Sequence, residues 1–145
     1  MRVEIKISGE VAEPYIVIYA STVTEEVQRV IDAAEQQGNI VSALDEDGRI
    51  AVLQPADIYL VRTEEERLAV YCEKKKYSSK KRLYEFAALL GVGFMQISRS
   101  AFVNLKYIDS VEACFNSMMR LRLKNGCCEY ISRKYLQDFK RYLGL

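Results

Sequence analysis

The chain contains no histidine and no tryptophan, and only two of its 145 residues are proline. Without histidine, the commonest general base at neutral pH and the mixed Cys/His zinc sites are both missing. The four cysteines form no Cys-x-x-Cys pair, so we expect reduced cysteines, no metal site and no cofactor. No activated nucleophile with its base is recognisable. The sequence therefore predicts that the protein is not an enzyme, with carboxylate or lysine catalysis as the last alternative.

Long apolar runs are missing as well. The longest ones, such as residues 15–20, are far shorter than the roughly 20 residues that cross a bilayer. The first residues, Met1-Arg2-Val3-Glu4, do not open a signal peptide. No low-complexity window occurs and 50% of the residues are hydrophobic, so the chain should fold throughout. We predict a soluble cytoplasmic protein without membrane insertion.

Charge is distributed unevenly along the chain. Residues 1–54 hold four Lys/Arg and ten Asp/Glu, for a charge of −6, whereas residues 55–145 hold seventeen and ten, for +7. We therefore expect an accessory unit over residues 1–54 and a basic domain over residues 55–145. A basic half points to a nucleic-acid surface, while lysines scattered over a solvated face are the alternative.

The acidic part begins with a pattern typical of strands. Val3, Ile5 and Ile7 alternate with polar residues, and residues 15–19 form a second apolar run, so two strands are expected. Residues 22–25 have the Thr-x-x-Glu pattern of a capping box, which predicts a helix from there to about Gly38. Such a ββα unit is too small to be stable alone and should pack on something.

The rest of the chain alternates strands with two helices. Residues 40–44 and 49–53 flank an acidic Asp/Gly turn and predict a hairpin; a receiver-type phosphorylation pocket is rejected because the segment is too short for it. The further strands are expected at 57–62, 67–73, from Tyr77, 94–98, 111–115, 118–124 and 127–131, and the helices at about 83–90 and 133–142. Asn125-Gly126 is typical of a type I′ hairpin turn.

Three polar, basic clusters in the second part could contact nucleic acid. They are residues 74–76 with 80–82, residues 98–100 (Ser-Arg-Ser) and residues 132–134 (Ser-Arg-Lys). The guanidinium fork of arginine suits guanine edges and phosphates, and serine hydroxyls and helix-start amides suit phosphate oxygens. Each cluster also has a plain structural explanation, namely a solvated surface for the lysines and helix capping for Ser132.

Two longer segments contain the Ser-Arg-Ser and Ser-Arg-Lys clusters among characteristic apolar residues. Residues 94–108, FMQISRSAFVNLKYI, are followed by LKNG at 123–126 and ISRKY at 131–135. In this order and at this separation they resemble the two signatures of the LytTR family of transcription-factor domains. Residues 57–59 and 83–90 fit the family's opening strand and short helix, so the resemblance covers residues 55–145.

The resemblance implies a fold and a function. The fold class would be α+β, mainly β, with stacked antiparallel β-sheets and short helices, preceded here by the small ββα unit. The function would be that of a sequence-specific transcriptional regulator that contacts duplex DNA through loops. Two alternatives from other classes stay open: a cytoplasmic protein–protein signalling module without DNA binding, and an RNA-binding protein, which would expose aromatic residues on a sheet face.

The resemblance also implies the DNA-binding residues. Arg99 takes the principal base-contacting position, flanked by Ser98 and Ser100, and Arg133 and Lys134 take the second loop. Asn104 matches a family position, with a loop-holding role as an equal alternative. A third contact comes from the turn at residues 64–67, where three glutamates oppose phosphate binding and leave only Arg67.

Assembly and regulation are the least defined by the sequence. Because exposed strand edges need covering, we expect residues 1–54 to pack on the β domain or to form a homodimer. A regulatory protein partner is a further expectation, since the chain has no room for a receiver domain.

Overall fold

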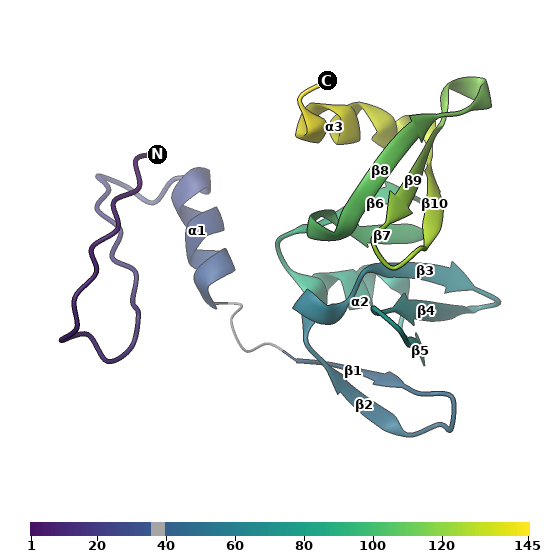
Figure 1. Ribbon diagram of the computed structural model, residues 1–145, viewed down its shortest axis with the longest axis horizontal. Helices are drawn as coiled ribbons and strands as arrows, with labels where there is room; N and C mark the ends of the chain where they lie inside the picture. The colour runs from purple at the N-terminus through teal and green to yellow at the C-terminus, as the bar shows by residue number, and fades with distance from the viewer. Residues whose placement is uncertain (36–39) are drawn as a thin grey trace.

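The computed structural model describes residues 1–35 and 40–145, and its elements are labelled in Figure 1. The helices of this part are α1 (Glu25–Glu35), α2 (Leu83–Leu90) and α3 (Arg133–Leu143). The strands are β1 (Val41–Leu44), β2 (Ile50–Leu53), β3 (Leu60–Glu64), β4 (Arg67–Tyr71), β5 (Lys76–Ser79), β6 (Phe94–Ser98), β7 (Ala101–Asn104), β8 (Ile108–Ala113), β9 (Met119–Leu123) and β10 (Cys128–Ile131). None of the helices in the described ranges is long and apolar enough to span a membrane.

The strands form two antiparallel sheets. The larger has seven strands in the order β2-β1-β5-β4-β3-β7-β6, and the smaller has three in the order β10-β9-β8. The expectation of a mainly β, antiparallel α+β fold is confirmed. The strands and helices predicted from residue 55 onward are found with shifted ends, but β7 was not predicted as a separate strand.

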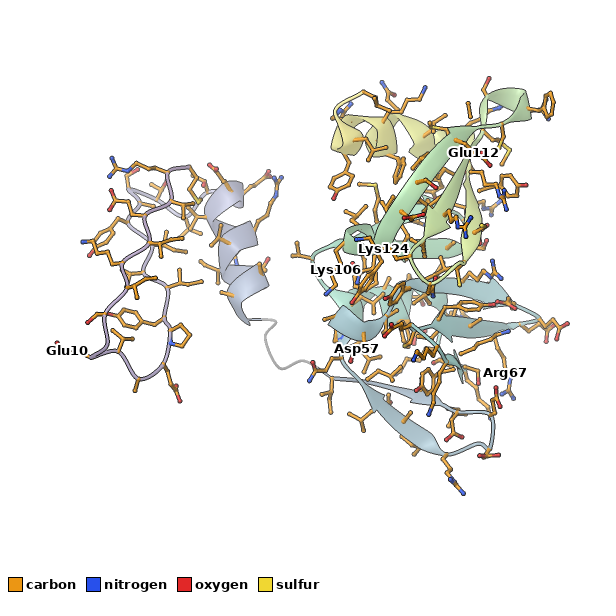
Figure 2. The ribbon with its side chains drawn as sticks, viewed as in Figure 1. Glu10, Asp57, Arg67, Lys106, Glu112 and Lys124 are labelled. Atoms are coloured by element: carbon orange, nitrogen blue, oxygen red, sulfur yellow. The ribbon has the colours of Figure 1, made fainter. Side chains whose placement is uncertain are left out.

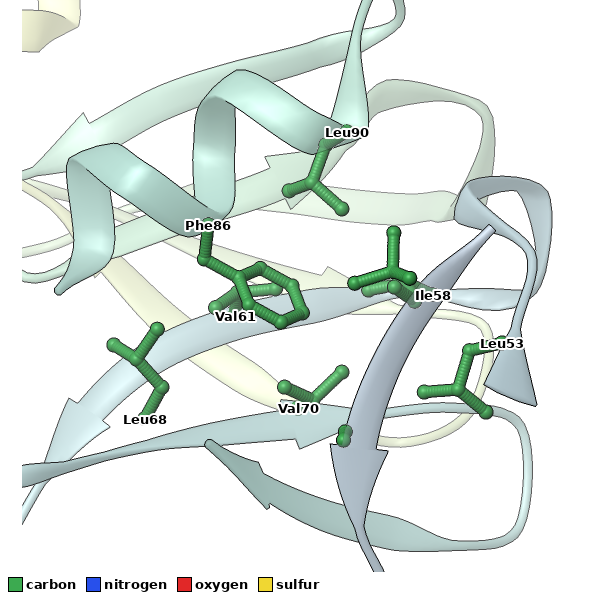
Figure 3. Packing of buried hydrophobic residues seen from close by; sticks show 9 residues of the cluster. Leu53, Ile58, Val61, Leu68, Val70, Phe86 and Leu90 are labelled. Carbon is green, nitrogen blue, oxygen red and sulfur yellow. The ribbon is translucent and has the colours of Figure 1, made fainter. Parts of the chain in front are cut away.

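Two hydrophobic cores hold the layers together, one on each face of the larger sheet. The first lies against α2 and includes Phe86 and Leu90 of that helix with Val61 and Val70 of the sheet (Figure 3). The second joins the larger sheet to the smaller sheet and α3, and its members are Tyr59, Leu60, Ile97, Ala101, Val103, Leu121, Leu123, Ile131 and Phe139. Burial on both faces explains why β3 and β4 are apolar at consecutive positions.

The predicted hairpin at residues 40–53 is present as β1 and β2. Strand β1 also pairs with β5, and Val41, Ala43 and Leu53 enter the first core. The Asp45 carboxylate accepts hydrogen bonds from the backbone N–H groups of Asp47 and Arg49, at 2.9 and 2.8 Å, which fixes the turn. The hairpin therefore extends the sheet of the basic domain, across the boundary expected after residue 54.

The two strands expected before α1 are not formed. Residues 1–24 contain a turn at Gly9, closed by a hydrogen bond from the Val11 N–H to the Ser8 carbonyl, but no strand. The apolar alternation is real, yet a strand also needs a neighbour for its backbone groups. The predicted ββα unit is thus corrected to an irregular segment followed by a helix.

Helix α1 begins later than the capping box predicted. The Thr24 hydroxyl, not that of Thr22, accepts from the Val27 N–H at 3.3 Å, so Thr24 is the N-cap. Val27 is buried, and Val30 and Ile31 are half-buried, as the helical spacing of the apolar stripe predicts. The predicted end of the helix at Gly38 lies outside the described residues.

Candidate nucleic-acid interface

Backbone pairing brings three connections of the β domain to one edge, of which the β3–β4 turn is visible on the right in Figure 1. Because β3 is antiparallel to β7, with Arg62 opposite Ala101, the β3–β4 turn lies beside the β6–β7 connection. The Thr63 N–H donates to the Ser100 carbonyl at 2.9 Å, which ties the two together. The Ser132 N–H donates to the Ile97 carbonyl, also at 2.9 Å, and brings the start of α3 to the same place. Sequence-distant site residues are therefore gathered along one edge.

The β6–β7 connection presents Arg99 at its tip. The Ser100 N–H donates to the Ser98 hydroxyl at 3.2 Å, and the two serine hydroxyls lie 3.3 Å apart. The pairing register shifts between Gln96 and Ser98, and such irregularities redirect side chains at the end of a strand pair. Arg99 is exposed and takes part in none of the ion pairs found in residues 1–35 and 40–145. Its guanidinium is free to engage a ligand.

The start of α3 presents the second basic pair. Ser132 occupies the N-cap position, but its side chain makes no capping hydrogen bond. The structural explanation of this serine as a cap is therefore absent, and its hydroxyl can bind a phosphate oxygen. Arg133 donates from Nε to the Asn116 carbonyl at 2.9 Å, which orients its guanidinium, and the Lys134 amine lies 5.6 Å from the centre of the Tyr135 ring. Both basic side chains are exposed.

The β3–β4 turn places Arg67 at the same edge (Figure 2). Its side chain is exposed, but Glu65 and Glu66 form the tip with φ values of 47° and 67°. Positive φ at both central positions is the conformation of a type I′ turn, which favours Asn-Gly over two glutamates. Two exposed carboxylates thus stand beside Arg67 in a strained turn.

The third carboxylate of this turn is already neutralised. Glu64 accepts hydrogen bonds from Tyr71 Oη, from Arg62 Nε at 2.9 Å and from Lys76 Nζ at 3.1 Å. Burial would raise the pKa of Glu64, but these hydrogen bonds outweigh it and lower the pKa to about 2. Arg62 also donates to Glu129 of the smaller sheet at 3.1 Å. No local sequence pattern predicts this network, which links the β3–β4 turn to the smaller sheet.

The two halves of the lysine-rich cluster lie at opposite edges. Strand β5 is antiparallel to β4 with Ser79 opposite Leu68, so residues 80–82 follow at the edge that carries Arg67. Lys76 lies opposite Tyr71, at the other end of the same strands, and residues 74–75 precede it there. Only residues 80–82, two lysines and an arginine, therefore join the candidate interface.

Asn104 lies away from this edge, at the far end of β7 from Arg99. It is buried, with 4% of its surface exposed. Its Nδ2 donates to the Ile58 carbonyl at 2.9 Å, and its Oδ1 accepts from the Lys106 N–H at 3.3 Å. This geometry favours the loop-holding alternative over a contact with DNA.

Stacked sheets that gather arginines, lysines and serine hydroxyls on adjoining loops present a surface of the kind suited to a polyanion. Residues 48–144 match the family described as the LytTr DNA-binding domain. This match covers more than half of the chain, and the chain belongs to the LytTR family.

The chain is also similar to curated regulators and to a solved structure. Two proteins of Staphylococcus aureus, from strains MSSA476 and MW2, are each 28% identical over 148 residues, covering 100% of this chain and 99% of each relative. Both carry the name uncharacterized HTH-type transcriptional regulator. A LytTr DNA-binding domain from Bacillus cereus superposes with a TM-score of 0.67 at 24% identity, over 74% of this chain and 98% of that one. The chain is a DNA-binding transcriptional regulator.

The relatives' name refers to a helix-turn-helix, which the described residues of this chain do not contain. Strands β1–β5 separate α1 from α2, and β6–β10 separate α2 from α3. A helix-turn-helix needs two helices joined by a short turn.

Relieving the strain in the β3–β4 turn should stabilise the fold. We expect the double variant Glu65→Asn/Glu66→Gly to raise the free energy of unfolding by about 1 kcal/mol, because both new residues tolerate positive φ. Urea unfolding followed by circular dichroism measures this. The double variant Glu65→Gln/Glu66→Gln is the control: it removes the same charges but keeps the strain, so its stability should match the wild type. Equal stabilisation of both variants would assign the effect to charge instead.

Proposed function

We propose that this regulator recognises specific sequences in duplex DNA through the edge formed by the β3–β4 turn, the β6–β7 connection and the start of α3. The convergence of these connections, with an exposed Arg99 that forms no ion pair within the described residues, carries the proposal. A set of short loops can follow a groove and its two phosphate backbones without a recognition helix. Binding rather than catalysis is the role of these residues.

Each residue of the edge has a distinct proposed part. Arg99 contacts base edges, and Ser98 and Ser100 hold its loop and bind phosphate. Arg133 is held by the Asn116 carbonyl and contacts a base or phosphate at the second loop. A larger group contacts the phosphates of the DNA, through basic side chains or a hydroxyl: Arg67, Lys80, Lys81, Arg82, Ser132 and Lys134.

Asn104 acts indirectly in this proposal. Its side chain bonds to the backbone at Ile58 and Lys106 and so fixes the chain where β7 ends. We assign it a positioning role and leave it out of the DNA-contacting set.

A matched pair of lysine variants tests the edge. Selection of binding sequences from a random duplex library first supplies the site, and titrations at several salt concentrations then measure affinity. We expect Lys81→Ala to reduce the slope of log affinity against log salt by about 1, since one phosphate contact is lost. Lys74→Ala removes the same charge at the opposite edge and should leave the slope unchanged. Equal effects of the two variants would show that only overall charge matters and would contradict the proposed edge.

We also propose two functional units with a boundary between α1 and β1. The pairing of β1 with β5 supports this division, because it makes the hairpin part of the DNA-binding domain. The preceding segment would then serve assembly, as a homodimer, and would offer its acidic surface to a regulatory protein. Since its ligand is chromosomal DNA, the protein would act in the cytoplasm.

A further inference from the structure

The segment before α1 exposes apolar side chains at a strand-like spacing. Val3, Ile5 and Ile7 have 76, 82 and 94% of their surfaces exposed. Most of residues 15–19 are exposed as well, although all five are apolar or tyrosine. Contiguous exposed apolar surface of this kind marks an interaction site. The alignments with the curated relatives cover 100% of this chain and so include this segment.

The charges between these apolar residues are self-complementary. In the order Arg2, Glu4, Lys6, the signs alternate along one side of the extended segment. An antiparallel pair of identical strands that is centred on Ile5 places Glu4 of each copy opposite Lys6 of the other. Val3 then faces Ile7, and the two Ile5 side chains face each other. Opposite charges and apolar pairs at facing positions are the contacts that stabilise antiparallel strands.

We propose that residues 2–8 of two copies pair in this register, about a two-fold axis at Ile5, and so form the dimer contact of the regulator. This inference rests on the proposed homodimer and specifies its contact surface. Lys6 forms no ion pair within the described ranges, and Glu4 is paired only with Arg2 of its own segment, at 3.1 Å. The partner's carboxylate therefore gives Lys6 its counter-charge.

Neighbouring registers are less favourable. Centring the pair on Glu4 would bring the two Glu4 carboxylates together and oppose Arg2 to Lys6. Centring it on Lys6 would bring the two Lys6 amines together. Directly opposed like charges destabilise a strand pair. One register is thus selected by charge, which prevents slippage between identical strands.

Two other exposed apolar segments among the described residues offer no such match. Strand β2 is an unpaired edge of the larger sheet, with Ile50 and Val52 exposed, but Ile50–Leu53 contains no charged residue to face Glu4 or Lys6. Residues 15–19 are also uncharged. After the turn at Gly9 they are suited to cover the outer edge of each strand, which would give four strands across the two copies. A sheet of three or more strands with an apolar face can be stable in water, whereas an isolated two-stranded hairpin is only marginally stable.

Charge reversal in the full-length chain tests this register. Sedimentation equilibrium over a range of protein concentrations should show a monomer–dimer equilibrium for the wild type. Lys6→Glu and Glu4→Lys should each weaken dimerisation about tenfold or more, because each change turns two attractive contacts into repulsive ones. The double variant Glu4→Lys/Lys6→Glu should restore the wild-type constant to within about threefold. Arg2→Ser is the control, since Arg2 faces the uncharged Ser8.

Each outcome has a defined meaning. A wild type that stays monomeric overturns the proposal, and so does a dimer that the double variant fails to restore; the second result would move the contact to β2 or to residues 15–19. Binding to a short duplex with a single copy of the selected site should be the same for all variants. Loss of that binding would contradict the DNA-contacting edge instead, so the two failures are distinguishable.

Discussion

Replacing Arg99 with alanine is expected to weaken binding to the selected DNA site by roughly 5- to 150-fold, or about 1–3 kcal/mol, the value of one bidentate contact to a base. The side chain is exposed at the tip of a loop that hydrogen bonds between Ser98 and Ser100 hold in place. Binding to unrelated DNA should change much less. Competition titrations with specific and random duplexes measure the two affinities separately.

A conservative variant separates base contact from phosphate contact. Arg99→Lys keeps the charge but loses the planar fork, so it should retain non-specific affinity while losing preference for the selected site. If Arg99→Lys instead kept full specificity, and Arg99→Ala weakened all duplexes equally, the side chain would be a phosphate contact. Arg133→Ala, measured in parallel, should show a smaller loss, because its Nε is already used by the Asn116 carbonyl.

Turn geometry shows how far local sequence determines this fold. Asn125-Gly126 correctly predicted a hairpin, but only Gly126 has a positive φ, of 90°, so the turn is not type I′. Asn125 instead donates to the Cys72 carbonyl at 2.9 Å and accepts from the Cys127 N–H at 3.0 Å. Consecutive positive φ values occur instead at Asn116-Ser117 and at Glu65-Glu66, and the second pair contains no Asn or Gly that would predict it. Strand register and hydrogen bonds to distant residues therefore determine the conformation of the turns at Glu65-Glu66 and Asn125-Gly126.

The limits of hydropathy patterns are clearest before α1. Alternation of Val3, Ile5 and Ile7 tells which side chains share one side of an extended segment, but it does not supply the neighbour that makes the segment a strand. For β3 and β4 that neighbour is the next segment of the chain, and the strand prediction is confirmed. For residues 1–24 no strand forms within the described chain. A second copy would supply the missing neighbour.

The candidate interface was only partly predictable for a related reason. The Ser-Arg clusters are visible in the sequence, but their adjacency depends on contacts such as that between Ser132 and Ile97. The Arg62–Glu129 ion pair joins residues 67 positions apart, and no local pattern announces it. Asn104 shows the converse case, in which a recognisable polar residue is buried and bonded to backbone. In each case the residue type indicated a possible contact with DNA. Strand pairing then determined which of these side chains are exposed and close enough together to make it.

Removing the aromatic ring of Phe139 is expected to lower the free energy of unfolding by about 3–5 kcal/mol, the usual cost of truncating a fully buried phenylalanine. Phe139 is 0% exposed and belongs to the core that α3 shares with Ile97, Leu121 and Ile131. Because Arg133 and Lys134 lie in the first turn of α3, Phe139→Ala should also weaken DNA binding by displacing them. Urea unfolding measures stability, and titration well below the unfolding midpoint measures binding.

Tyr142→Ala is the matched control on the same helix, since Tyr142 is 51% exposed and its loss should change stability by no more than about 0.5 kcal/mol. Phe139→Leu should recover much of the lost stability, because it refills most of the cavity. A loss below about 1 kcal/mol for Phe139→Ala would show that α3 contributes little to the second core. In that case core packing would not position Arg133 at the start of α3. The hydrogen bond from Arg133 to the Asn116 carbonyl would then be the contact that positions it.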